Sequence, residues 1–529
     1  MKTFRAMFKK ANFSREFFVL LAIVVLAVFL RTYKLQESPI FVDEATFISF
    51  ERDMISSKVS WYEPLADYFG DGIAYVFLPT TLLFGPNIFF LRFTAVLFSA
   101  ASIFLLYFFT KRLYNKKVAL FSCFILAIST SDFFISTEFW ELPVINFFII
   151  LFLYSFARYS ETRNKYYFFL IAFVIGFATI TNPIFLFFLA SFLITFRLNS
   201  FISFLKFRRS LTKKIFFVGF LFFFLGIFQM LYWNLLNNFA TLKFIINHVP
   251  VTADSKNLFD IRGNLSQGYF NFINFLDNGS NFGILQFVKH LNSIMFLSYF
   301  LLFLMFTFEF AVQSKKIGEE KKDIYILLNF VLIILFLSLL TITTFRYECF
   351  CILLPFYSII IGSTAVHLID SIKKWKMILT FFVILSLSLG MINLLSGYDQ
   401  LIESRKTNLC NQVIEGLVKF FNNSSNSTLV FDISKYEIFY GFYNETKNLS
   451  ILRPHYAISS QLPELWANLI QNKNNEYVFV SKLCLSPWAT NLNIYENFVS
   501  FVNANHKKLI LEAIVSSNDE ELFRVVRVS

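Results

Sequence analysis

Residues 84–129 decide the fold, and they read FGPNIFFLRFTAVLFSAASIFLLYFFTKRLYNKKVALFSCFILAIS. Two apolar runs, each close to the roughly 17–25 residues that cross a bilayer, are separated by the short basic stretch 111–117. In hydrocarbon a backbone N–H finds a partner only within its own segment, so both runs are predicted to be helices. The stretch therefore predicts two membrane spans joined by a short basic loop.

The same pattern continues along most of the chain. Of its 529 residues 56% are hydrophobic, above the roughly 45–50% typical of a soluble domain, and the mean hydropathy is +0.60. We predict an α-helical polytopic membrane protein with about eleven spans, at 16–32, 87–110, 118–136, 143–157, 167–181, 183–197, 214–233, 286–312, 324–342, 349–368 and 377–396. The first run lacks a small-residue cleavage site and is expected to remain as an anchor.

The distribution of charge indicates how these spans are oriented. A net charge of +12 is compatible with nucleic-acid binding, but the Lys and Arg residues concentrate in alternate connections between the spans, which is the pattern of a topology signal. The rule that basic loops stay inside places the N-terminus in the cytoplasm. With an odd number of spans, the C-terminal tail lies outside. We therefore expect a multi-pass protein of the cell membrane that binds no nucleic acid.

Three sizeable pieces are expected on the extracytoplasmic side: the loops 33–86 and 234–285, and the tail 397–529. In the tail TLVFDI, NLSILR and EYVFVS read as strands, ELWANLIQN and YENFVSFVNA as helices, and KLILEAIV and ELFRVVRV as a closing hairpin. This order predicts a membrane domain over 1–396 followed by a small α/β domain over 397–529.

The first external loop holds an acidic pair among apolar neighbours, Asp43 and Glu44 in the stretch SPIFVDEATF, 38–47. Such a pair can act as a base or provide oxygen ligands to a divalent cation. A structural alternative is that it caps an amphipathic interfacial helix, DEATFISFERDMISS. The sequence leaves both interpretations open.

Further polar residues are predicted on the same side of the membrane. An Arg inside a span is costly, so Arg92 is a functional candidate by itself. The connections and span ends on this side also supply carboxylates for proton or metal chemistry, namely Asp132, Glu138 and Glu141. They further supply basic residues for an anionic group, His290, Lys289 and Arg346, and the polar residue Tyr347.

Four stretches together resemble the GT-C superfamily of membrane glycosyltransferases, in particular its protein O-mannosyltransferase and aminoarabinose (lipid A) transferase branch. The resemblance covers roughly the first 400 residues. It rests on the order and spacing of FVDEA (41–45), the opening stretch (84–129), YYFFLIAFVIGFATITNPIFLFFLASFLI (166–194) and FRYECFCILLPFYSIIIG (345–362).

This resemblance implies transfer of a sugar from a polyprenyl-phosphate carrier to a lipid, glycan or protein acceptor on the outer face. By position, Asp43 would be the general base or one member of an acidic pair with Glu44, and Glu141 would be the second acidic position. Arg92 and Arg346 would contact the carrier phosphate. Glu138, Tyr347 and His290 are expected to bind substrate, and Asp43 with Glu44 is the candidate site for a divalent metal ion.

The chain also departs from the pattern of this superfamily. Where the superfamily often has His-Pro-Pro, residues 61–72 read WYEPLADYFGDG, and Asn182 stands where Lys is frequent. A lipid or sugar transporter, or a catalytically silent scaffold, is therefore an alternative, although the sequence shows no inverted repeat of the kind that transporters frequently have.

Overall fold

The computed structural model describes residues 15–38, 42–57, 60–62, 72–199, 213–239 and 351–371 and, in the tail, 428–431, 450–452, 476–480, 499, 502–504, 509–517 and 520–528. The chain forms two compact units. The first comprises Met1–Leu35 and Asp53–Tyr398, and the second comprises Gln36–Arg52 and Asp399–Ser529.

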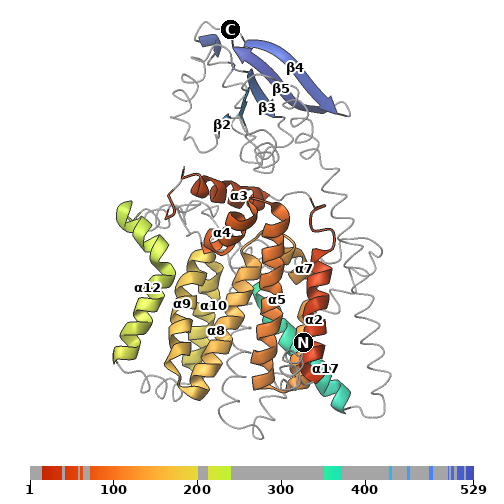
Figure 1. The fold of residues 1–529 in the computed structure, drawn as a ribbon, viewed down its shortest axis with the longest axis vertical. Helices are drawn as coiled ribbons and strands as arrows, with labels where there is room; N and C mark the ends of the chain where they lie inside the picture. Colours follow the sequence, from red (N-terminus) through yellow and green to blue (C-terminus); the bar gives the residue numbers. More distant parts are fainter. Residues whose placement is uncertain are drawn as a thin grey trace, which may run out of the picture. The chain divides into compact units, whose positions relative to one another are not determined.

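The first unit is a bundle of helices (Figure 1). Its helices are α2 (Arg15–Thr32), α4 (Gly72–Phe84), α5 (Ile88–Leu113), α6 (Lys116–Ala127), α7 (Thr130–Ser136), α8 (Leu142–Thr162), α9 (Lys165–Thr181), α10 (Ile184–Asn199), α12 (Lys213–Leu236) and α17 (Leu354–Ser371). Helix α5 packs against α2, α6 and α8; α9 packs against α8 and α12; and α17 packs against α6.

Asparagine side chains determine where several of these helices begin. Asn87 accepts a hydrogen bond from the Phe89 N–H at the start of α5, and Asn115 accepts one from the Val118 N–H at the start of α6. Asn164 does the same for Tyr166 at the start of α9. Each cap satisfies an N–H that the helix itself leaves unpaired, so the short connections between spans also define the helix ends.

Seven of the eleven predicted spans lie close to single described helices, and 286–312, 324–342 and 377–396 lie outside the described residues. The predicted span 118–136 is wrong as one helix. It is divided into α6 and α7 at Ile128 and Ser129, because the Ser129 side chain accepts from the Asp132 N–H and starts a new helix there. The apolar helix α4 lies within residues 33–86, which the sequence predicts to be an external loop.

Helices α9 and α12 cross closely at two facing glycines, with no bulky side chain between them. A Cβ atom added at Gly226 in α12 would lie 2.6 Å from the Phe173 carbonyl oxygen, and one added at Gly176 in α9 would lie 2.4 Å from the Phe223 carbonyl oxygen. Glycines of this kind let two membrane helices approach through their backbones.

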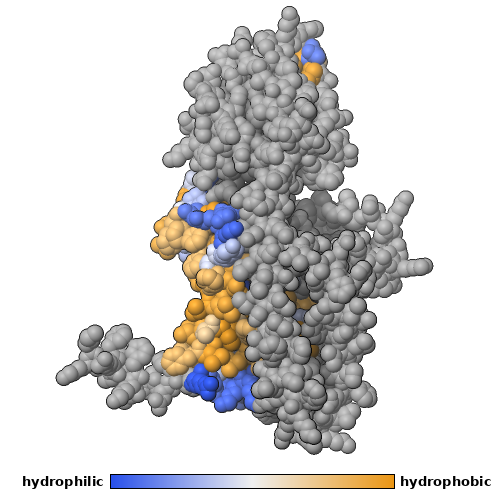
Figure 2. Space-filling model, turned by 90° about the vertical axis from the view of Figure 1, so that its right-hand side faces the viewer, coloured by the Kyte–Doolittle hydropathy of each residue, from blue (hydrophilic) through white to orange (hydrophobic). Residues whose placement is uncertain are grey.

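The outer surface of the first unit has the properties of a lipid-facing protein. Of the described helices, α5, α8 and α12 are long and apolar enough to cross a membrane. Exposed apolar side chains line α12, among them Phe216, Phe217, Leu225, Phe228 and Leu235. Figure 2 shows an apolar patch at one side of the molecule, with hydrophilic residues above and below it.

One end of the bundle is rich in basic residues, namely Lys111, Arg112, Lys116, Lys117, Arg158, Arg163, Lys165, Lys213 and Lys214. At this end Glu16 pairs with Lys111 and Lys116, and Arg112 pairs with Glu161. The other end carries aromatic residues, with Tyr62 and Tyr232 in edge-to-face contact. Aromatic residues are typical of membrane–water interfaces.

The second unit contains a five-stranded sheet with the order β2-β1-β3-β5-β4. Its strands are β1 (Thr428–Phe431), β2 (Ser450–Leu452), β3 (Glu476–Val480), β4 (Leu509–Ser517) and β5 (Glu520–Val528). Strand β1 is parallel to β2 and β3, whereas β5 is antiparallel to β3 and β4. The five predicted strands, including the closing hairpin, are therefore present, while the helices predicted in the tail lie largely outside the described residues.

Candidate functional site

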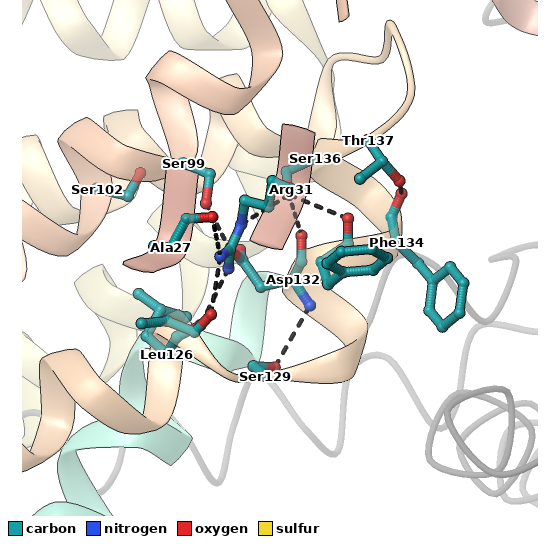
Figure 3. Close-up of polar contacts among 12 residues, drawn as sticks. Ala27, Arg31, Ser99, Ser102, Leu126, Ser129, Asp132, Phe134, Ser136 and Thr137 are labelled. Atoms are coloured by element: carbon teal, nitrogen blue, oxygen red, sulfur yellow. Dashed lines mark hydrogen bonds and ion pairs between the residues drawn. The ribbon is translucent and has the colours of Figure 1, made fainter. Parts of the chain in front are cut away.

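A fully buried ion pair lies where α2 ends. Arg31 Nη2 is 2.6 Å from Asp132 Oδ2 in α7, and both side chains are almost completely removed from solvent. The other guanidinium hydrogens are also used: Nε donates to Ser136 Oγ, Nη1 donates to the carbonyls of Ala27 and Ala127, and Nη2 also donates to the carbonyl of Leu126 (Figure 3). A buried pair is tolerated when its remaining polar atoms are hydrogen-bonded in this way.

The ion pair joins four parts of the chain. Asp132 Oδ2 also accepts a 2.6 Å hydrogen bond from Ser99 Oγ in the middle of α5. The Leu126 and Ala127 carbonyls belong to the last turn of α6, where a helix leaves carbonyls unpaired and favours a cation. Arg31 therefore connects the end of α2 to the α6–α7 junction, and Asp132 connects this junction to α5 through Ser99.

Arg92 lies in the first turns of α5 and is fully buried. Its Nη1 atom donates a 2.8 Å hydrogen bond to the carbonyl of Leu35, four residues beyond Arg31. Ser99 follows Arg92 by seven residues, about two helical turns, so both side chains lie on one face of α5. The guanidinium of Arg92 is thus held at the same end of the bundle as the Arg31–Asp132 pair.

The connection between α7 and α8 carries two further buried carboxylates, Glu138 and Glu141. Glu141 occupies the N-cap position of α8 but makes no capping bond with its side chain. Instead, Glu141 Oε1 accepts a 2.8 Å hydrogen bond from Asn182 Nδ2, at the end of α9. Asn182 Oδ1 accepts from the Ile184 N–H at 2.8 Å, and this fixes which side of the amide faces Glu141.

Helix α4 begins beside this hydrogen bond. A Cβ atom added at Gly72 would lie 2.3 Å from Thr181 Oγ1 and 2.6 Å from the Thr181 backbone nitrogen. Only a glycine allows this approach. The first residue of α4 therefore lies against the residue that precedes Asn182, so α4, α8, α9 and α10 meet around Glu141.

The acidic pair predicted in the first external loop lies on α3 (Val42–Ile55), most of which belongs to the second unit. The helix begins at Val42, so Asp43 lies inside its first turn and not at a cap before it. Glu44 and Glu51 are fully buried and, seven residues apart, lie on one face of α3. That Asp43 and Glu44 converge with Arg92 and Glu141 stays a prediction.

The other predicted site residues divide into two groups. The structure buries Arg92, Glu138 and Glu141 within the first unit, whereas His290, Lys289, Arg346 and Tyr347 lie outside the described residues. That Arg92 and the two Glu residues share one site stays a prediction. The sequence indicated Asp132 as a site residue but gave it no partner. The sequence analysis did not identify Arg31 or the hydrogen bond from Asn182 to Glu141. The available signal for Arg31 was its charge at the end of an apolar run. The signal for Asn182 was an amide where the superfamily often has Lys.

A divalent metal ion needs several oxygen or nitrogen ligands around one point. Within the ranges that the structure describes, no group of three or more His, Cys, Asp and Glu side chains is placed to hold one. Glu44 has the oxygen chemistry that such an ion prefers, but the described residues do not complete a ligand set around it.

Comparison with known proteins indicates the class of protein. Residues 72–233 match the family model described as dolichyl-phosphate-mannose-protein mannosyltransferase. The matched segment includes Arg92, Asp132, Glu138, Glu141 and Asn182. No curated protein matches the chain by sequence.

Solved structures share the fold along almost the whole chain. The structure of ArnT from Cupriavidus metallidurans bound to undecaprenyl phosphate has a TM-score of 0.59 and 11% sequence identity, and the match covers 97% of this chain and 98% of that one. The apo structure of the same protein has a TM-score of 0.62 and 10% identity, covering 96% and 97%. The resemblance to GT-C membrane glycosyltransferases that the sequence indicated is confirmed.

Proposed function

We propose that the protein is a glycosyltransferase that moves a sugar from a polyprenyl-phosphate carrier to a lipid, glycan or protein acceptor on the extracytoplasmic face of the membrane. One observation carries the proposal: the segment that matches the mannosyltransferase family model holds a buried guanidinium, Arg92, and a buried carboxylate, Glu141, at one end of a bundle with the ArnT fold.

The proposed chemistry is a substitution at the anomeric carbon of the sugar. An acceptor hydroxyl oxygen forms a bond to this carbon while the bond from the carbon to the phosphate oxygen breaks. Asp43, with Glu44 beside it, takes the hydroxyl proton, and Glu141 is the second acidic group of the site. Polyprenyl phosphate leaves with one more negative charge, which Arg92 and Arg346 stabilise by charge-assisted hydrogen bonds.

The remaining predicted residues complete the substrate site, with Glu138, Tyr347 and His290 contacting the sugar or the acceptor. The carrier is half lipid, so its phosphate must be met at the edge of the bilayer, and the exposed apolar patch of the first unit suits its hydrocarbon tail. In ArnT a carrier of this kind, undecaprenyl phosphate, is bound. If a divalent ion binds, Asp43 and Glu44 are the residues that would provide its oxygen ligands.

We further propose the full organisation of the chain. Residues 1–396 form a membrane domain with eleven spans and a cytoplasmic N-terminus, and residues 397–529 form an extracytoplasmic α/β domain. The five strands in the tail and the basic residues at one end of the bundle support this arrangement.

Transfer of labelled sugar tests the proposal. Purified protein in lipid nanodiscs is given polyprenyl-phosphate-linked radioactive sugars and a membrane extract that contains acceptors. Asp43→Asn is expected to lower the transfer rate by about 100-fold or more, because a general base contributes roughly 10²–10⁴-fold. Arg92→Gln is expected to lower it by about 10- to 100-fold, because a hydrogen bond to a charged group contributes about 1.5–3 kcal/mol.

Arg112→Gln is the matched control, since Arg112 lies at the other end of the same helix and pairs with Glu161. Equal transfer by the parent and Asp43→Asn would refute the mechanism. Movement of the carrier across liposomes without any transfer would favour a flippase, and neither activity would favour a scaffold.

A further inference from the structure

We propose that the Arg31–Asp132 ion pair positions two separate parts of the transfer site: the α7–α8 connection with Glu138 and Glu141, and the carbonyl that holds Arg92. This inference rests on the proposed function. Arg31 and Asp132 are positioning residues in it, and neither is expected to touch the substrate.

The first step is that the pair leaves Arg31 very little freedom. Its five N–H donors all have acceptors, at 2.6–3.2 Å, on α2, α6 and α7. Figure 3 shows the guanidinium between Ala27, Leu126 and Asp132, with Ser99 beside the carboxylate. Ser136 Oγ accepts from Arg31 Nε and donates to the Asp132 carbonyl, so both ends of the short helix α7 are tied to Arg31.

The second step leads from α7 to the carboxylates. Only residues 137–141 separate the end of α7 from the start of α8. Thr137 is held on α7 by hydrogen bonds to the carbonyls of Phe133 and Phe134, and the Glu141 carbonyl accepts from the Ile145 N–H of α8. Because the connection is short and fixed at both ends, a shift of α7 moves Glu138 and Glu141 with it.

The third step leads from α2 to Arg92. Beyond Arg31 the chain turns tightly, with hydrogen bonds from the Tyr33 N–H to the Leu30 carbonyl and from the Leu35 N–H to the Thr32 carbonyl. The Leu35 carbonyl then accepts from Arg92. Helix α5 is thus held twice, once through Ser99 at Asp132 and once through Arg92 at Leu35.

The cost of burial argues against stability as the main role of this pair. Apolar residues of similar volume often replace a buried ion pair without loss of stability. An ion pair in which every N–H donor is hydrogen-bonded fixes the orientation of the joined helices as well as their distance, whereas an apolar contact does not fix orientation. Placement of reacting groups needs direction, and a misplacement of about 1 Å can lower a rate by about 10²-fold.

The test is a double variant, Arg31→Met with Asp132→Leu, which removes both charges and keeps an apolar filling. Its matched control is Arg112→Met with Glu161→Leu, which removes an ion pair between α5 and α8 at the opposite end of the bundle. Three quantities are measured for both variants in nanodiscs: the melting temperature, kcat and KM for the carrier-linked sugar, and amide hydrogen exchange by peptide.

We expect the Arg31/Asp132 variant to keep its melting temperature and KM within experimental error while kcat falls by about 10- to 100-fold. Amide exchange should become faster in residues 33–36 and 137–141. The control variant should keep kcat. Unchanged kcat, or unchanged exchange in both segments, in a folded Arg31/Asp132 variant would overturn the inference.

If that double variant does not fold, Ser99→Ala tests the inference instead. This change removes one hydrogen bond to Asp132 and leaves the Arg31–Asp132 ion pair in place. A fall in kcat of a few-fold with faster exchange at 137–141 supports positioning, and parental values of both contradict it. If the parent itself transfers no sugar, the proposed function fails, and exchange alone then tests whether the pair orders the two segments.

Discussion

At the scale of single residues, the hydrogen bond between Asn182 and Glu141 has the clearest consequence. Asn182→Asp keeps an oxygen to cap α10 at Ile184 but replaces the donor to Glu141 with a second carboxylate about 2.8 Å away. Two like charges at this distance repel strongly in a buried place. We expect transfer to fall by at least about 100-fold, measured as kcat/KM with carrier-linked sugar.

The control for this prediction lies at the other end of the same helix. Asn164→Asp also converts a capping Asn, and Asn and Asp cap helices almost equally well, so its transfer should equal that of the parent. Asn182→Lys restores a donor to Glu141 and should retain far more activity than Asn182→Asp. Equal activity of Asn182→Asp and the parent would mean that Glu141 has no part in the reaction.

At the residue scale, the sequence predicts individual charged residues of the candidate site but not the residues with which they pair. The candidates Arg92, Glu138 and Glu141 are recognisable because a charged residue in or beside an apolar run is costly and needs a reason. The partners of buried charged residues are not recognisable in this way, and Arg31 is an example. Its partner Asp132 is 101 positions away in the sequence, and several other acids could have paired with it. Only the packing of α2 against α6 and α7 selects Asp132.

At the scale of elements, the crossing of α9 and α12 makes a prediction about stability. Gly226→Ala would gain about 1 kcal/mol of helix propensity, but its Cβ would meet backbone atoms of α9 that do not move aside easily. Overpacking of this kind costs about 1–3 kcal/mol, so the melting temperature in detergent should fall.

Gly219→Ala in the same helix provides the contrast. There the added Cβ meets the ring of Phe168, a side chain that is able to rotate away, so the change should be close to neutral. A lower melting temperature for Gly219→Ala than for Gly226→Ala would show that α9 and α12 do not cross as described.

Elements were predicted well where caps and apolar runs coincide, as at α5 and α9, and less well elsewhere. Residues 118–136 look like one span because their composition is apolar throughout. The break comes from Ser129, a residue too common to be recognised as a cap by itself, together with the buried bond that draws Asp132 toward Arg31. Helix α4 was missed because Pro79 lies inside it and its apolar run is short.

At the scale of the whole molecule, the basic residues at one end of the bundle predict orientation. Trp61→Cys and Tyr166→Cys place a thiol at exposed positions near opposite ends of the first unit. In intact cells a membrane-impermeant maleimide should label Trp61→Cys, and it should label Tyr166→Cys only after permeabilisation. The reverse result would place the basic loops outside and the proposed site in the cytoplasm.

The central claim is that one end of the bundle receives the phosphate of a polyprenyl carrier. The most direct measurement is a density map of the parent protein in nanodiscs loaded with polyprenyl phosphate. The phosphate is predicted to lie within hydrogen-bonding distance of Arg92, in a cavity that also contains Asp43 and Glu141. A phosphate bound at the opposite end, beside Lys111 and Lys116, would contradict the claim.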